Sequence, residues 1–149
     1  MAVSDHFSEE DRKKILRAIA EAENQTSGEI RLFVENKCDD SVLDRAAFVF
    51  GQLEMQKTKD RNGVLFYVAF DSRQFAILGD AGIHAKVKDD FWNDIKNRMA
   101  EHFKKGEFVE GLSEGIRQSG EALRKHFPHQ RNDRNELPDD IIFNNNSNL

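Results

Sequence analysis

The hydrophobic positions along this chain change their period several times, and each change predicts a different element. Residues 29–35 alternate between apolar and mostly polar side chains, which is typical of a strand with one well-buried face. Residues 64–70 are all apolar, which indicates a central strand covered on both faces. A short polar connection, residues 71–73, then leads into a third apolar run at 74–79. The pattern predicts a parallel pair of strands followed by an antiparallel hairpin strand.

Amphipathic segments around these strands predict helices. Ser8 and Ser41 each stand before an apolar stripe, and a serine hydroxyl at such a position can accept a backbone N–H of the first turn. The helix that starts at Ser41 connects the first two strands. Two further helices follow the third strand, one carrying Phe91 and Trp92, and the next carrying Phe127 and ending before Pro128.

Gly111 and Gly115 lie one turn apart in the last of these helices. Each glycine costs a helix up to about 1 kcal/mol relative to alanine. Close packing against a neighbouring backbone would justify that cost, and we expect it here.

The predicted fold class is therefore α/β, with a small mixed sheet sandwiched between helices. The chain has 149 residues, which suits one domain with a real core. We assign this domain to residues 1–128 and a polar, Asn-rich C-terminal tail to residues 129–149. The tail is either disordered or docked in part through Leu137 and the apolar residues 141–143.

Composition narrows the classes of function. The formal charge is −5, with 22 Lys plus Arg interleaved with 27 Asp plus Glu, so we expect no binding to nucleic acid. The single cysteine, Cys38, permits neither an internal disulfide nor a thiolate zinc cluster. No secretion signal and no apolar run long enough for a transmembrane segment stand out. These features predict a cytoplasmic location and a monomer.

The predicted topology collects acidic residues at two ends of the sheet. The first rim comprises Glu29, residues 60–62 and Asp80, and the second rim comprises Glu35, Asp39, Asp71 and Arg73. The second rim lies beyond the carboxyl ends of the parallel strands, the usual ligand edge of open α/β sheets, so topology alone favours it. Convergent carboxylates suit Ca²⁺, with Mg²⁺ less favoured because it keeps more water. The alternative is that Asp and Asn are frequent in turns simply because they bond their own backbone.

Three motifs resemble those of the TPM-domain family. These are Thr26-Ser27-Gly28-Glu29-Ile30, Arg61-Asn62-Gly63-Val64-Leu65 and Gly79-Asp80-Ala81-Gly82-Ile83. The family groups thylakoid-lumen and photosystem-repair proteins, a receptor-associated protein and many bacterial proteins, and this chain is similar to a soluble bacterial-type branch. The resemblance implies a sheet of about four strands between helices. It also implies a surface cleft near the first motifs, and it implies that the chain could share the calcium binding or phosphate-ester hydrolysis of some members.

Position by position, Glu29, Asn62, Gly63 and Asp89 match common family residues, and this moves the expected site to the first rim. The chain departs from the family at Arg61, Asp80 and His84, where many relatives have an acid, a Tyr and a Glu. These departures bear directly on metal ligation and catalysis.

Three functions remain open at this point. The first is a Ca²⁺-binding module with the ligands Glu29, Asp60, Asn62, Asp80 and Asp89, and with Asp39 and Asp71 at the second rim as the other candidate. The second is a weak metal-assisted phosphatase in which Glu29, Asp60 and Asp80 hold the cation. The third is a metal-free domain that binds a protein partner. No catalytic residue stands out.

Overall fold

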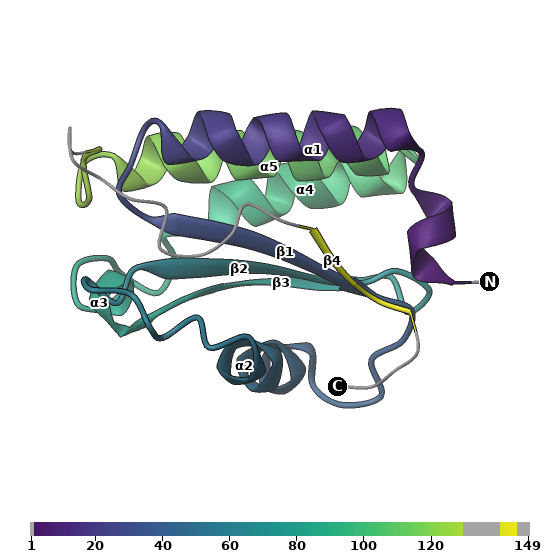
Figure 1. Cartoon of the computed structure of the whole chain (residues 1–149), viewed down its shortest axis with the longest axis horizontal. Coiled ribbons are helices and arrows are strands. Elements are labelled where there is room, and N and C mark those ends of the chain that lie inside the picture. Colours follow the sequence, from purple (N-terminus) through teal and green to yellow (C-terminus); the bar gives the residue numbers. More distant parts are fainter. Residues whose placement is uncertain (1, 130–140, 146–149) are drawn as a thin grey trace.

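The computed structural model describes residues 2–129 and 141–145. The chain forms a four-stranded sheet in the order β3-β2-β1-β4, with helices on both faces (Figure 1). The elements in chain order are η1 (Val3–His6), α1 (Glu9–Glu23), β1 (Glu29–Glu35), α2 (Val42–Gln52), β2 (Gly63–Ala69), β3 (Gln74–Gly79), α3 (Ala81–His84), α4 (Asn93–Lys104), α5 (Phe108–Leu123) and β4 (Ile141–Asn144). The predicted α/β class, a small mixed sheet between helices, is confirmed.

The strand pairing follows the pattern read from the sequence and adds one strand to it. β1 and β2 run parallel with Glu29 opposite Gly63, and β3 returns antiparallel to β2 with Val64 opposite Gly79. β4 pairs in parallel with β1 and places Leu32 opposite Ile141. This strand comes from the tail, and its four residues are too few for periodicity to identify.

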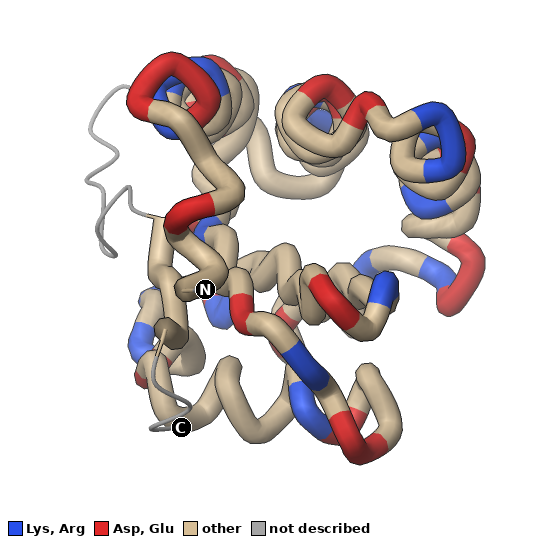
Figure 2. Tube along the Cα trace, turned by 90° about the vertical axis from the view of Figure 1, so that its right-hand side faces the viewer, with Lys and Arg blue, Asp and Glu red and all other residues tan. Residues whose placement is uncertain are grey.

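The helices divide into two layers. α1, α4 and α5 lie side by side over one face of the sheet, and α2 covers the other face (Figures 1 and 2). The larger core lies under the three helices, and the smaller one, which includes Phe33, Met55 and Tyr67, lies under α2. Every residue of β1 and β2 is buried. The expectation of a single well-buried face for β1 was therefore incomplete, because its polar residues such as Arg31 and Glu35 are also buried, and Arg45 of α2 reaches Glu35.

Several helix boundaries differ from expectation. Ser8 forms the expected capping box with Asp11, whereas Ser41 precedes α2 without a side-chain capping bond. Phe91 and Trp92 come before α4, in a turn where their rings meet edge to face at 4.8 Å. Phe127 lies beyond the end of α5. Apolar periodicity runs on through these turns because their aromatic side chains also enter the core.

The packing around Gly111 and Gly115 also differs from the expected close approach of a neighbouring backbone. A Cβ built on Gly115 would lie 2.5 Å from Met99 Sδ, and one on Gly111 would lie 2.8 Å from the Phe103 ring, so both glycines face side chains of α4. The close backbone approach is at Gly120, where a Cβ would lie 2.6 Å from Ala22 Cα in α1. No helix among the described residues is long and apolar enough to cross a membrane.

Candidate functional site

The first rim is built from three loops that the sheet brings together. Glu29 N donates to Asn62 O at 3.3 Å, which joins the starts of β1 and β2. Asp80 N donates to Gly63 O at 2.9 Å, which joins the end of β3 to the same place. Glu29, Asn62 and Asp80 are all nearly buried, at 3%, 1% and 7% exposure. The structure therefore assembles the core of the predicted first rim.

Asn62 is the most buried of these three residues. Its backbone N–H donates to Thr58 Oγ1 and its side-chain Nδ2 donates to Ser27 Oγ, both at 3.2 Å. Its Oδ1 is also buried, yet it has no hydrogen-bond partner among the described residues. A buried amide oxygen left without a donor costs about 1–3 kcal/mol, so this atom has an unused capacity to bind a ligand.

Arg61 and Asp80 form a bidentate ion pair beside Asn62. Arg61 Nε lies 2.7 Å from Asp80 Oδ2, and Arg61 Nη2 lies 2.9 Å from Asp80 Oδ1. Asp80 Oδ1 also accepts from Ala81 N at 2.8 Å, which caps the start of α3. The Asp80 side chain is 7% exposed while that of Arg61 is 50% exposed, so the guanidinium closes the carboxylate off from solvent. The hydrogen bond to Asp80 raises the pKa of Arg61.

The remaining predicted ligands of the first rim are arranged differently. Asp60 and Asp89 are exposed, as is His84. Asp60 contributes its backbone, because Gly82 packs so closely that a Cβ there would lie 2.1 Å from the Asp60 carbonyl oxygen. Within residues 2–129 and 141–145, no three His, Cys, Asp or Glu side chains are gathered as a metal site. Any cation at this rim therefore depends on amide and backbone oxygens as well as carboxylates.

The second rim holds a buried carboxylate, but not those of Asp39 and Asp71, which are both exposed. Glu35, 5% exposed, receives two hydrogen bonds from Arg45, from Nε to Oε2 and from Nη2 to Oε1, each at 2.8 Å. Tyr67 donates its hydroxyl to Glu35 Oε2, and Asn144 Nδ2 donates to Oε1 at 3.0 Å. One carboxylate thus connects β1, β2, α2 and β4.

The pKa of Glu35 reflects this set of donors. Burial by itself would raise it, but the hydrogen bonds from Arg45, Tyr67 and Asn144 outweigh burial and hold the pKa of Glu35 below its ordinary value. Burial and the same carboxylate raise the pKa of the Tyr67 hydroxyl. Glu35 stays ionised and fully bonded, so it acts as a structural anchor. Sequence reasoning placed Glu35 at this rim and missed its partners, although a tyrosine inside a continuous apolar run is a signal of a buried hydroxyl that needs an acceptor.

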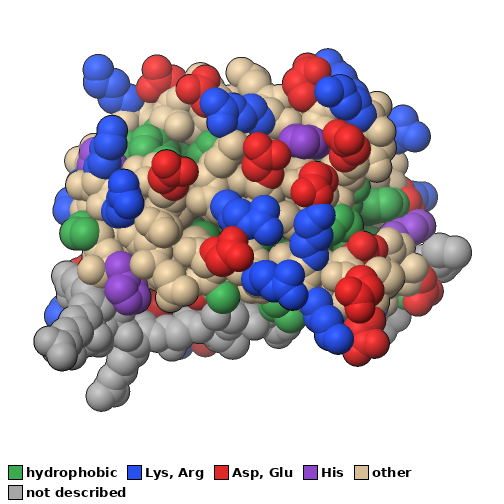
Figure 3. Space-filling model, turned by 90° about the horizontal axis from the view of Figure 1, so that it is seen from above, with side chains coloured by type: hydrophobic (Ala, Val, Ile, Leu, Met, Phe, Trp, Pro, Cys, Tyr) green, Lys and Arg blue, Asp and Glu red, His purple; other side chains and the backbone are tan. Residues whose placement is uncertain are grey.

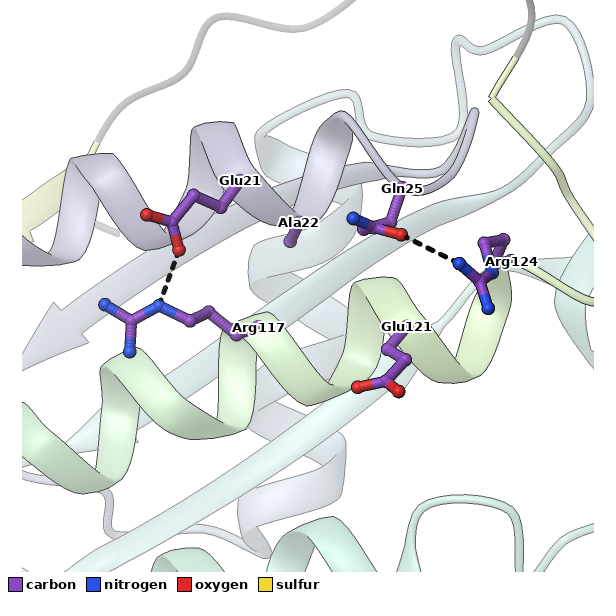
Figure 4. A pocket seen from close by; sticks show the side chains of 6 residues that line it. All are labelled: Glu21, Ala22, Gln25, Arg117, Glu121 and Arg124. Atoms are coloured by element: carbon purple, nitrogen blue, oxygen red, sulfur yellow. Dashed lines mark hydrogen bonds and ion pairs between the residues drawn. The ribbon is translucent and has the colours of Figure 1, made fainter.

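A separate polar pocket of about 360 Å³ lies between α1 and α5 (Figure 4). Its charged groups are largely engaged with one another, because Arg117 Nε lies 2.7 Å from Glu21 Oε2 and Arg124 Nη1 lies 3.3 Å from Gln25 Oε1. Because these side chains already bond to one another, the pocket leaves few hydrogen-bonding groups for a ligand.

The helical face that contains this pocket carries both signs of charge. Figure 3 shows Lys and Arg interleaved with Asp and Glu across it, without a basic stripe. Cross-helix pairs such as Lys14 with Glu110, and His102 with Glu114 at 2.8 Å, account for part of this mixture. A phosphate backbone would find no continuous positive surface on this face.

Comparisons with known proteins agree with the geometry. The family model of the TPM domain matches residues 3–122. The solution structure of the BA42 protein from the psychrophilic bacterium Bizionia argentinensis is 44% identical and has a TM-score of 0.88, covering 94% of this chain and 97% of that one. The N-terminal domain of a protein from P. gingivalis shares the fold at 22% identity and a TM-score of 0.67, over 84% of this chain and 82% of that one. A search of curated proteins finds no match.

Proposed function

Because the chain belongs to the TPM domain family, we propose that it is a Ca²⁺-binding α/β module whose cation site is the first rim. The observation that carries this proposal is the buried Oδ1 of Asn62, which has no hydrogen-bond partner among the described residues. A cation at this oxygen would remove the cost of leaving it unsatisfied.

The neighbouring groups have the chemistry that Ca²⁺ prefers. Ca²⁺ takes six to eight oxygens from carboxylates, amides, backbone carbonyls and water in flexible geometry. Glu29, the first residue of β1, and Asp80, which follows β3, bring two carboxylates to the strand ends joined to Asn62. The loop before β2 adds the carbonyl of Asp60, whereas that of Arg61 already accepts from Gly82 N at 2.8 Å. Water would complete the coordination.

Arg61 works against cation binding in the arrangement described. Its guanidinium occupies the Asp80 carboxylate and places a positive charge at the rim. Because its side chain is half exposed, it can swing into solvent when a cation arrives. We therefore expect Arg61 to lower the affinity for Ca²⁺ without abolishing binding.

The test is an amide NMR titration with Ca²⁺ and with Mg²⁺, starting from protein treated with EDTA. Ca²⁺ should shift the amides around Glu29, Asn62 and Asp80, and Mg²⁺ should do so more weakly. Arg61→Ala should tighten Ca²⁺ binding about tenfold, because a unit charge about 6 Å from a divalent cation opposes it by ~1.4 kcal/mol even in water. Arg73→Ala, at the second rim, is the matched control and should leave the affinity unchanged. Ca²⁺ shifts confined to the second rim, or none at all, would contradict the proposal.

A phosphatase is the second candidate, and Arg61 is the observation that favours it. The matching family model carries the name TPM phosphatase, and a half-exposed guanidinium beside a cation site is a suitable phosphate contact. Turnover of p-nitrophenyl phosphate with added Ca²⁺ or Mg²⁺ tests this candidate. The same variant separates the two functions, since Arg61→Ala should tighten Ca²⁺ binding yet reduce turnover. If no metal supports turnover, the phosphatase proposal is refuted, and the Ca²⁺-binding proposal is unaffected.

A further inference from the structure

A groove of about 730 Å³ opens at the other end of the sheet, between β3 and α4. The sheet contributes Val68, Phe70 and Phe75 to its lining, while α4 and the start of α5 contribute Phe103 and Phe108. Phe75 and Phe103 meet edge to face at 5.1 Å, and Phe103 lies 4.9 Å from Phe108. These phenylalanine side chains remain partly exposed, so the groove presents an aromatic floor to solvent.

One wall of the groove is an edge strand. β3 is the outermost strand of the sheet next to β2, and no other described strand pairs with it. The bond from Asp80 N to Gly63 O fixes which residues of β3 face β2. Because the two sides alternate along an antiparallel strand, Phe75 and Ile77 direct their N–H and C=O groups away from the sheet. Ile77 is only 3% exposed, so the main-chain groups that this edge offers to solvent beside the groove are those of the partly exposed Phe75. Phe75 therefore contributes twice to this site: its ring lines the groove, and its main-chain N–H and C=O point away from β2.

The charge at the groove is opposite to that of the protein. Its charged lining residues are Arg73 and Lys104, both exposed, with no acid among the lining residues. Arg73 makes no ion pair within the described part of the chain, and Lys104 makes only an exposed contact with Glu101 at 3.8 Å. The chain as a whole carries a formal charge of −5. A local positive pair on an acidic protein selects an anionic partner.

We propose that this groove binds an extended peptide that carries apolar side chains and flanking acidic residues. The peptide pairs with the edge of β3, which supplies main-chain hydrogen bonds through the N–H and C=O of Phe75. Its apolar side chains enter the phenylalanine-lined groove, and its carboxylates meet Arg73 and Lys104. A small amphiphilic anion could use the groove and the charges but has no backbone to pair with β3. The outward-directed main-chain groups of Phe75 therefore favour a peptide.

The probe is a pool of acetylated, amidated pentapeptides with Asp or Glu at both ends and Val, Ile, Leu or Phe between them. Added to the ¹⁵N-labelled full chain, the pool should shift the amides of Phe75, Ile77, Phe103 and Lys104. It should also slow hydrogen exchange at the amide of Phe75, since this group gains an acceptor. The same pool with Lys at both ends should bind about fivefold more weakly, in keeping with an exposed ion pair worth about 1 kcal/mol.

Two controls isolate the charge and the strand pairing. Arg73→Glu should weaken binding of the acidic pool and strengthen binding of the basic pool. Arg98 is an exposed residue of α4 outside the groove lining, so Arg98→Glu should change the binding of neither pool. Acidic peptides N-methylated at alternate residues, which cannot pair with an edge strand, should lose binding. The proposal is overturned if none of the peptides shifts the groove amides, if N-methylated peptides bind equally well, or if decanoate produces the same shifts without slowed exchange.

Discussion

Gly120 is the position where the packing of α1 on α5 leaves no room for a side chain. A Cβ built there would lie 2.6 Å from both Cα and O of Ala22 and 2.7 Å from its Cβ. Two of these atoms belong to the backbone of α1, which cannot rotate aside as a side chain can. Gly120→Ala must therefore push the two helices apart along the interface that closes the main core.

The magnitude follows from two opposed effects. Alanine stabilises a helix by about 1 kcal/mol relative to glycine. Overpacking typically costs about 1–3 kcal/mol, and a clash with backbone atoms should cost at least the upper value of this range. We expect Gly120→Ala to lower the free energy of unfolding by about 2 kcal/mol, which corresponds to a fall in Tm of about 6 °C for a chain of this size.

The same substitution at two other glycines provides the controls. At Gly115 the contact is with Met99 Sδ, and that flexible side chain can move, so Gly115→Ala should stay within about 1 kcal/mol of the parent. At Gly51 in α2 nothing lies within 4 Å of the added Cβ, so Gly51→Ala should stabilise by up to about 1 kcal/mol. Urea unfolding followed by circular dichroism measures all three. A Gly120→Ala protein as stable as the parent, alongside a stabilised Gly51→Ala, would refute the packing argument.

Two further predictions concern titratable groups. Hydrogen bonds that His102 donates to the Glu107 and Glu114 carboxylates raise the pKa of His102. Its contribution to stability is therefore fully present below the unfolded pKa of about 6.5 and is lost as pH rises through the folded pKa. The Tm difference between the parent and His102→Gln should thus be largest near pH 6 and vanish in alkaline solution; a difference independent of pH would contradict this. Glu35→Gln should cost about 3 kcal/mol, because it leaves the largely buried Arg45 without its anion, while the exposed Glu54→Gln should cost almost nothing in the same urea experiment. The pKa of Glu35 is lowered in the folded state, so its contribution should be present above the unfolded pKa and be lost as pH falls through the folded value; equal acid unfolding of parent and variant would show that the carboxylate is not the anchor.

The sequence predicted the elements whose apolar pattern is long enough to have a period. β2 has seven apolar or small residues and lies at the centre of the sheet, as its unbroken pattern requires. β4 has four residues and lies far from β1 in the sequence, so only tertiary pairing makes it a strand. The polar residues of β1 are all buried, although their pattern indicates a solvent-facing side, because partners such as Arg45 and Asn144 on Glu35 come from distant parts of the chain.

The candidate site was predictable in outline for a similar reason. Glu29, Asn62 and Asp80 each stand at a strand end, and strand order brings such positions together. Asp60 and Asp89 stand in longer loops, where sequence position does not fix the direction of a side chain, and both are exposed. Arg61 of the Arg61–Asp80 pair has a φ of +50°, an uncommon conformation for a residue other than glycine. The neighbouring sequence does not predict this conformation.

The two proposed sites lie at opposite ends of the β2–β3 hairpin, and this separation makes their tests independent. β3 has six residues, so at about 3.3 Å per residue the ends of the strand are roughly 20 Å apart. That distance is more than twice the screening length of about 8 Å in physiological salt. The charge of Arg73 at the groove is therefore scarcely felt at Asp80, and that of Arg61 is scarcely felt at Phe75. A cation site at the first rim must respond to Arg61 and ignore Arg73, and a peptide in the groove must do the reverse. A variant that altered both would indicate a change in the hairpin itself instead of the loss of one local contact.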